Sequence, residues 1–180
     1  SLANPGGVIT DISALKEIAK EVGIPLIIDN TMATPFLCQP IEHGADIVIH
    51  STTKFLSGHG NAMGGAIVDA GTFDWSQNNN FPSLSEPEDA YHGINFYESF
   101  GDLAYTTYGH AVGLRDLGPT MAPMNAYLTI MGIETLALRM DRHVQNAISV
   151  AKFLETHDKV SWVSYAGLKS SKYHKLGKKY

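Results

Sequence analysis

The stretch ADIVIHSTTKFLSGHG, residues 45–60, joins a continuous apolar run to a polar turn. The apolar run, residues 45–49, is predicted to form a strand, as is the run at residues 24–28, which has the continuous hydrophobic character of a strand covered on both faces. The turn begins with the hydroxyls of Ser51 and Thr53 and continues with Lys54 and a glycine-rich segment. A lysine just beyond a buried strand can be partly desolvated, which favours the neutral amine needed for a Schiff base. We therefore expect Lys54 to hold an aldehyde cofactor, and Ser51 and Thr53 to bind a phosphate.

A carboxylate follows the preceding apolar run in the same way. Residues 24–28 read IPLII, and Asp29 comes directly after them. Pyridoxal phosphate needs an amine for its aldehyde, an anion against its pyridinium nitrogen and donors around its phosphate. Lys54 and Asp29 together therefore indicate a pyridoxal phosphate site. Taken singly, each has an ordinary explanation, because most lysines are solvated and a carboxylate after a strand is common turn or helix-cap chemistry.

The rest of the first half alternates helical and strand patterns. Apolar residues recur at helical spacing from Ile12 to Val22, and Gly23 is placed to end that helix. A short helix is expected at residues 40–44 and a further strand at residues 64–68. This alternation predicts an α/β layer fold, whose ligands bind outside the carboxyl ends of the strands.

The second half has a different composition. Residues 71–100 are rich in Asn, Pro, Ser and aromatics. We interpret them as an ordered surface excursion rather than a disordered linker, because their aromatic side chains carry more apolar area than disordered segments usually do. A helix from about residue 133 to residue 156 is expected to lead into a second domain, whose first strand is predicted at residues 160–165.

The overall composition limits the class of protein. The chain has 44% hydrophobic residues, 17% charged residues and a formal charge of −5, as expected for a soluble globular protein with no sign of nucleic-acid binding. No apolar run approaches the ~20 residues that span a bilayer. The N-terminus has no signal pattern, so we expect a cytoplasmic protein. Cys38 is the only cysteine and is expected to be buried and structural.

Metal binding is not predicted, because the eight histidines form no HExxH pattern and no Cys/His cluster. His59 follows the cofactor turn, and its role is left open. Arg115, Arg139 and Arg142 are expected to form ion pairs within or between subunits, with the anchoring of a carboxylate as the alternative.

The turn around Lys54 resembles the signature of a known family. Residues 51–54, STTK, followed by SGH at residues 57–59, resemble the pyridoxal-lysine motif of the transsulfuration enzymes of Cys/Met metabolism. Residues 29–35, DNTMATP, and the opening SLANP, residues 1–5, are similar to the same family. The resemblance continues with few gaps to Tyr180.

The resemblance implies a fold and a division into domains. The fold is that of the fold-type I, aspartate aminotransferase-like, pyridoxal phosphate-dependent transferases, with a three-layer α/β/α large domain and a mostly parallel sheet. Residues 1–135 would belong to this cofactor-binding domain, with residues 71–100 as its surface excursion. Residues 136–180 would be the linking helix and the start of a small α+β C-terminal domain.

The resemblance also implies roles for five side chains. Lys54 would form the Schiff base and then carry protons between the substrate and the cofactor. Asp29 would keep the ring nitrogen protonated. Asn4 would bind the phenolic oxygen, and Ser51 and Thr53 the phosphate.

Within the family, four short segments resemble the O-acetylhomoserine sulfhydrylases; these are residues 71–75, 81–82, 86–87 and 91–93. That subgroup implies γ-replacement, in which O-acetylhomoserine and sulfide, or a thiol, give homocysteine, or methionine, and acetate. The alternatives are a methionine γ-lyase, a cystathionine γ-synthase or lyase, and an inactive interaction module. The thiol donor is left open.

Family members are longer at both ends, so we expect this chain to be an internal fragment that is incomplete for catalysis. The expected partners are small-molecule substrates and other copies of the same subunit, in a homotetramer built from dimers that share active sites.

Overall fold

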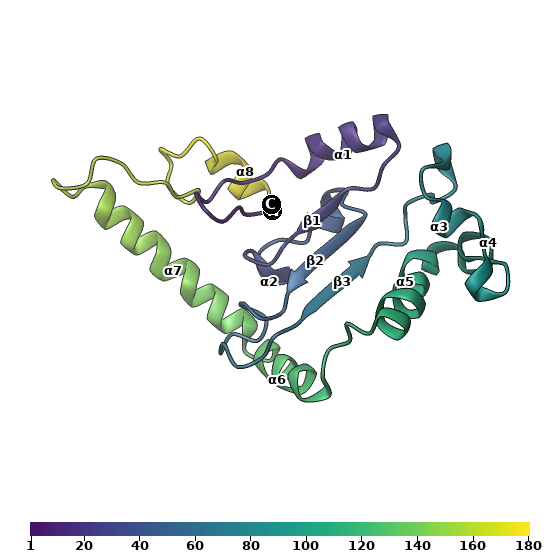
Figure 1. Ribbon diagram of the computed structural model, residues 1–180. Coiled ribbons are helices and arrows are strands. Elements are labelled where there is room, and N and C mark those ends of the chain that lie inside the picture. Colours follow the sequence, from purple (N-terminus) through teal and green to yellow (C-terminus); the bar gives the residue numbers. More distant parts are fainter.

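The computed structural model describes residues 1–180 and is built around a small mixed sheet (Figure 1). Its three strands, in the order β1-β2-β3, are β1 (Ile27–Asp29), β2 (Ile47–Ser51) and β3 (Gly65–Asp69). β1 runs parallel to β2, with Ile27 opposite Ile47, and β3 runs antiparallel to β2, with Val68 opposite Val48. The α/β layer prediction is confirmed, and one of the two strand pairs within this sheet is parallel.

One face of the sheet is covered by helices from the first part of the chain. They are α1 (Ile12–Val22), α2 (Thr34–Leu37) and the 3₁₀ helix η1 (Pro40–His43). α1 forms as predicted, because the Asp11 side chain accepts the Ala14 N–H at its start and Gly23 ends it in a left-handed conformation. Ile28 and Val48 pack in the core beneath these helices. The other members of this core are Ile12, Ala33, Cys38 and Ala45.

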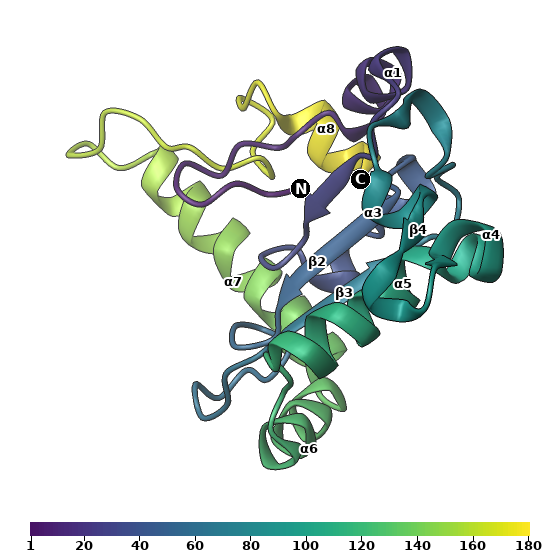
Figure 2. The same ribbon diagram turned by 45° about the vertical axis from the view of Figure 1, so that its right-hand side comes forward.

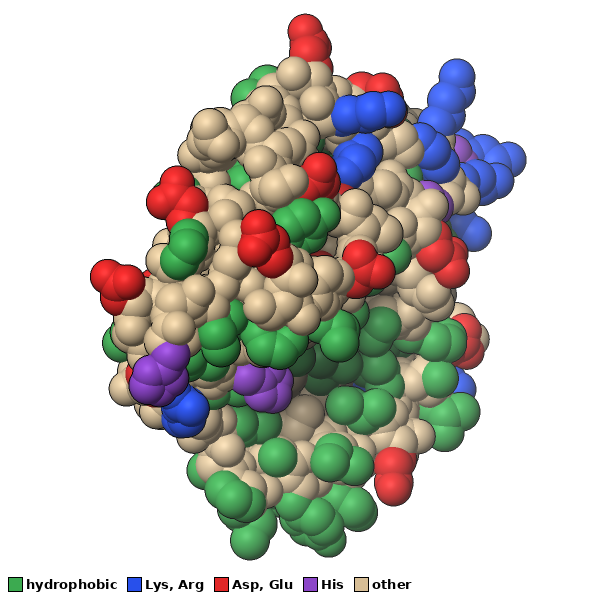
Figure 3. Space-filling view, turned by 90° about the vertical axis from the view of Figure 1, so that its right-hand side faces the viewer, with side chains coloured by type: hydrophobic (Ala, Val, Ile, Leu, Met, Phe, Trp, Pro, Cys, Tyr) green, Lys and Arg blue, Asp and Glu red, His purple; other side chains and the backbone are tan.

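Short elements from residues 71–117 cover the opposite face. They are η2 (Gln77–Asn79), α3 (Pro82–Ser85), β4 (Pro87–Glu88), η3 (Asp89–Tyr91), β5 (Ile94–Asn95), α4 (Phe96–Phe100), η4 (Gly101–Leu103), α5 (Ala104–Tyr108) and the π-helix η5 (Gly109–Leu117). The Trp75 ring stacks on the Tyr105 ring with centroids 5.1 Å apart, and Phe96 is 2% exposed. Apolar side chains also border a hollow on the face of the molecule that carries α4 and α5 (Figure 3).

The C-terminal part contains α6 (Pro123–Ile133), α7 (Leu136–Glu155) and α8 (His174–Lys179). Figure 2 shows α7 and α8 on the side of the sheet away from α3 and α5. α7 matches the long helix expected from the sequence. The strand predicted at residues 160–165 does not form, because no strand of this chain lies alongside those residues to complete a ladder of hydrogen bonds. None of the helices has the length and apolar character that a membrane crossing requires.

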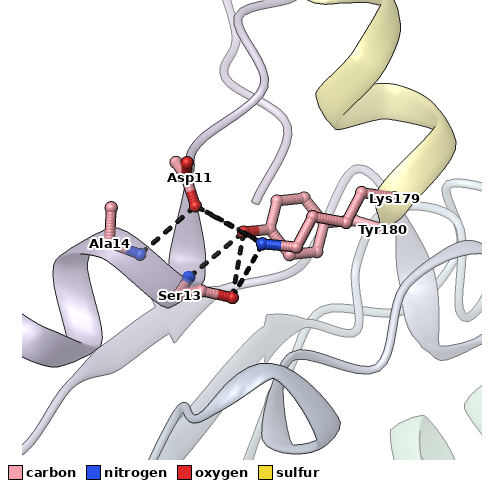
Figure 4. Close-up of polar contacts among 5 residues, drawn as sticks. All are labelled: Asp11, Ser13, Ala14, Lys179 and Tyr180. Atoms are coloured by element: carbon pink, nitrogen blue, oxygen red, sulfur yellow. Dashed lines mark hydrogen bonds and ion pairs between the residues drawn. The ribbon is translucent and has the colours of Figure 1, made fainter.

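One tyrosine fastens the end of α8 to the start of α1 (Figure 4). The Tyr180 hydroxyl donates to Asp11 Oδ1 at 2.6 Å and accepts the Ser13 N–H at 3.1 Å. Lys179 Nζ lies 3.0 Å from Ser13 Oγ and 3.8 Å from Asp11 Oδ1. Hydrogen bonds, from Tyr180 first and then from the Ala14 N–H, hold the pKa of Asp11 below its usual value. We call these side chains the Tyr180 contact.

Candidate active site

The carboxyl ends of β1 and β2 border an open pocket with a volume of about 1130 Å³. Because the two strands are parallel neighbours, their polar ends meet at the same edge of the sheet. Asp29 comes from the end of β1, Ser51 from the end of β2, and Thr53 from the turn beyond it. Tyr105 and His110 also line this pocket. Ligand pockets commonly hold about 300–1,000 Å³, so this one is large enough for a cofactor.

Asp29 is an exposed carboxylate in a hydrogen-bonded turn. The Thr31 N–H donates to Asp29 Oδ1 at 2.8 Å, and Thr31 Oγ1 accepts the Ser51 N–H at 2.8 Å, so Thr31 links the ends of the two strands. Partial burial acts to raise the pKa of Asp29, but the hydrogen bonds from Thr31 are the main cause that outweighs it and lowers the pKa. Asp29 is therefore an anion at neutral pH.

The two predicted phosphate ligands differ in availability. The Thr53 hydroxyl donates to Gly64 O at 3.3 Å and accepts the Gly64 N–H at 3.1 Å, which ties the turn to the start of β3. The half-buried Ser51 uses its N–H toward Thr31, and its hydroxyl makes no hydrogen bond within the chain. Ser51 is thus free to donate to a ligand, while Thr53 would first have to release its bond to the Gly64 carbonyl.

Lys54 lies in the turn formed by residues 52–58, which we call the lysine turn. The Gly58 N–H donates to Lys54 O at 2.8 Å and closes the turn. Ser57 is 0% exposed, but the Lys54 side chain is exposed and does not line the pocket. The expectation that Lys54 would be partly desolvated at the strand end is therefore wrong, because the lysine turn leaves the sheet at the molecular surface.

Asn4 lies apart from the other predicted site residues. It lines a second pocket of about 560 Å³, together with Cys38 and Tyr165. Its segment does reach the end of β1, since Ser1 Oγ donates to Asn30 Oδ1 at 2.6 Å. The structure thus brings Asp29, Ser51 and Thr53 to one pocket, places Lys54 beside it, and leaves Asn4 outside it.

His50 is a pocket residue that the sequence analysis did not assign to the site. It lines the same pocket and is 7% exposed, and its Nδ1 atom has no hydrogen-bond partner. Burial lowers the pKa of His50 against the raising effect of Asp29, so the ring is neutral at pH 7. The sequence does contain an indication of this position. A strand that starts two residues after the predicted one, at residues 47–51 instead of 45–49, includes His50.

The chemistry of these groups suits one kind of ligand. An ionised carboxylate suits a cationic ring nitrogen, free hydroxyls suit phosphate oxygens, and a primary amine condenses with an aldehyde. No group of three or more His, Cys, Asp or Glu side chains is placed to hold a metal ion. The donor set therefore fits pyridoxal phosphate.

The family of Cys/Met metabolism PLP-dependent enzymes matches residues 1–180 of the chain. An O-acetyl-L-homoserine sulfhydrylase of Leptospira meyeri is 48% identical over 188 residues, which cover 100% of this chain and 42% of that protein. A homocysteine synthase of Schizosaccharomyces pombe is 50% identical over 182 residues, with the same coverage. The chain thus spans less than half the length of these curated relatives.

Two solved structures are similar to this chain. One is a Campylobacter jejuni protein assigned as an O-acetylhomoserine (thiol)-lyase, with a TM-score of 0.94 and 42% identity over 100% of this chain and 45% of that chain. That protein carries N'-pyridoxyl-lysine-5'-monophosphate. The other is metB of Corynebacterium glutamicum, with a TM-score of 0.73 and 35% identity over 99% of this chain and 38% of that chain.

Proposed function

The chain belongs to the family of Cys/Met metabolism PLP-dependent enzymes, and we propose that the whole protein makes homocysteine and acetate from O-acetylhomoserine and sulfide. In this reaction the bond between Cγ and the acetyl oxygen breaks, and a bond between Cγ and sulfur forms. One observation carries the proposal: the Asp29 carboxylate and the free Ser51 hydroxyl meet at one pocket, with Lys54 in the adjoining turn.

The bound cofactor would supply an electron sink for the carbanion that forms when the substrate loses its α-proton. In this proposal Lys54 Nζ holds the cofactor aldehyde covalently and, once the substrate amine has replaced it, moves protons between the substrate carbons. Asp29 supports this because its lowered pKa keeps it ionised against a protonated ring nitrogen. The Ser51 hydroxyl donates to the phosphate, and Thr53 adds a second donor after its contact with Gly64 rearranges.

Asn4 is included in the proposal as the residue that binds the phenolic oxygen. Its support is the resemblance of residues 1–5 to the family and the hydrogen bond that joins Ser1 to Asn30 at the end of β1. Ser1 already contacts Asp29, because its amino group donates to Asp29 O at 2.8 Å. The proposed role therefore requires the Asn4 side chain itself to move from the second pocket, which it lines here, to the pocket at Asp29.

The proposal extends to the organisation of the whole protein. Residues 1–135 form part of the cofactor-binding domain, and residues 136–180 begin the small domain. The protein is a cytoplasmic homo-oligomer, a tetramer in which paired subunits complete each active site. Light scattering on the full-length protein would test the oligomeric state.

The experiment for the function uses the full-length protein that contains this chain, loaded with pyridoxal phosphate. Borohydride reduction followed by peptide mass mapping should give a single reduced adduct on Lys54, and Lys54→Ala should lack it. The loaded enzyme should then release homocysteine from O-acetylhomoserine and sulfide. A product mixture of keto acid and ammonia without homocysteine would contradict the proposal and indicate a lyase.

A further inference from the structure

The lysine turn is fastened to the junction between α6 and α7 by the guanidinium group of Arg139. Arg139 Nη1 donates to Phe55 O at 2.8 Å, and Nη2 donates to Leu56 O at 3.4 Å. Nη2 also donates to Gly132 O at 2.7 Å, in the last turn of α6. The sequence analysis expected Arg139 to pair with a carboxylate, but all three of these acceptors are backbone carbonyls.

The guanidinium is itself held in a fixed orientation. Its Nε donates to Thr135 Oγ1 at 3.2 Å, and Thr135 Oγ1 in turn donates to Gly132 O at 3.3 Å. Arginine presents several donors in one rigid plane, so it can bind acceptors on two segments at once, and a lysine ammonium cannot reproduce that geometry. Arg139 therefore fixes the lysine turn relative to α6 and α7 rather than merely neutralising a charge.

Two glycines allow this close contact. A Cβ atom on Gly132 would lie 2.1 Å from Ser57 O, so the backbone of α6 meets the backbone of the lysine turn directly. A Cβ atom on Gly58, whose φ is +73°, would lie 2.5 Å from Arg139 Nη1. Both glycines are needed where they stand because any larger residue would push the turn away from the guanidinium.

An apolar contact supports the same junction. Leu56 from the lysine turn packs with Leu136 and Met140 of α7, and these three side chains are 7%, 6% and 3% exposed. Phe55 packs against the edge of this cluster. The turn is thus held by apolar packing and by the hydrogen bonds of Arg139, while Lys54 is left exposed.

We propose that Arg139 is a positioning residue, which sets the place of the Lys54 amine by holding the two peptide carbonyls that follow it. This inference rests on the proposed function, because it assigns Lys54 to the cofactor. Arg139 touches neither Asp29 nor Ser51, so it acts only through the turn. When the guanidinium is lost, the turn can shift against the ends of β1 and β2, and a displacement of about 1 Å at a reacting group can lower a rate by about a hundredfold.

The test compares the full-length, cofactor-loaded wild-type protein with Arg139→Gln, Arg139→Lys and the control Arg142→Gln. Arg142 lies on the same helix, and its exposed side chain makes no hydrogen bond or ion pair within the chain, so the intrachain ion pair expected for it does not form. For Arg139→Gln we expect kcat to fall about ten- to a hundredfold with KM little changed, and the pH midpoint of the lysine-bound cofactor absorbance to shift. Arg139→Lys should be intermediate, and Arg142→Gln should match the wild type.

Thermal unfolding measured in parallel separates positioning from stability. If Arg139→Gln does not fold, the same measurements are made on Arg139→Lys and on Thr135→Val. The second of these variants removes the hydroxyl that accepts a hydrogen bond from Arg139 Nε. A folded Arg139 variant with wild-type kcat and an unshifted pH midpoint would overturn the inference. A wild-type protein that gives no reduced adduct on Lys54 would instead overturn the proposed function.

Discussion

The lysine turn and the Tyr180 contact both join the C-terminal third of the chain to its N-terminal part, but they are held by different groups. Arg139 binds backbone carbonyls in a partly buried place, where two backbones touch. Tyr180 binds the ionisable side chain of Asp11 at the surface, where the side chains of Asp11 and Lys179 are 45% and 47% exposed. Backbone carbonyls are not protonated in the ordinary pH range, so the strength of the Arg139 contact should not depend on pH. The Tyr180 contact should depend on pH, because Asp11 can be protonated.

The largest effect is expected from Gly132→Ala in the full-length protein. The new methyl group would overlap the Ser57 carbonyl, and neither group can rotate away, because the backbone fixes the position of both. Overpacking of this kind costs about 1–3 kcal/mol, which chemical unfolding would measure. The matched control is Gly109→Ala, because a Cβ atom there meets nothing within 4 Å. Gly109 has helical backbone angles, so alanine should leave stability unchanged or raise it by up to about 1 kcal/mol. Equal stability of the two variants would show that the lysine turn is not tightly docked.

A smaller effect is expected from Tyr180→Phe. This change removes the hydroxyl that joins Asp11 to the Ser13 N–H but keeps the ring, which packs edge-on against His43. Because the contact is partly exposed, we expect the melting temperature to fall by about 2 °C or less. A loss of stability as large as that of Gly132→Ala would mean that the Tyr180 contact stabilises the fold as much as the docking of the lysine turn does, and would contradict the prediction.

The smallest effect is a dependence on pH that only the Tyr180 contact should show. The pKa of Asp11 is lowered in the folded chain, so its stabilising contribution is complete above the usual value of 3.8 and is lost as pH falls through the folded value. The difference in melting temperature between wild type and Asp11→Asn should therefore shrink between pH 6 and pH 3. The corresponding difference for Arg139→Gln should not change for this reason, because its acceptors do not titrate.

Local features of the fold could be predicted from the sequence. The spacing from Ile12 to Val22 and the glycine at position 23 specify α1, because capping and periodicity are local properties. β2 begins two residues later than expected, since Asp46 is occupied with Lys16, at 2.7 Å, and with the Leu26 N–H, at 2.8 Å. Such a side-chain contact joins distant segments and leaves no mark in the hydrophobic pattern.

The residue types of the candidate site could be predicted from the sequence. The exposure of Lys54 and the contact of its turn with Arg139 could not. Asp29 and Ser51 reach one pocket because parallel strands end at the same edge of the sheet. The exposure of Lys54 depends on what packs around its turn, which sequence position alone does not determine. Arg139 acts on a residue 84 positions away, so no local motif could reveal it.

The lysine turn and Arg139 lie far apart in the sequence, so they leave the ribosome at different times during protein synthesis. Translation adds about 5–20 residues per second, so the 84 residues from Phe55 to Arg139 take roughly 4–17 s to appear. During that interval the nascent lysine turn has neither its guanidinium nor the helix junction against which it packs. Lys54 therefore cannot reach its final position until a much later part of the chain has emerged from the ribosome, and stable cofactor capture should follow the synthesis of α7 rather than precede it.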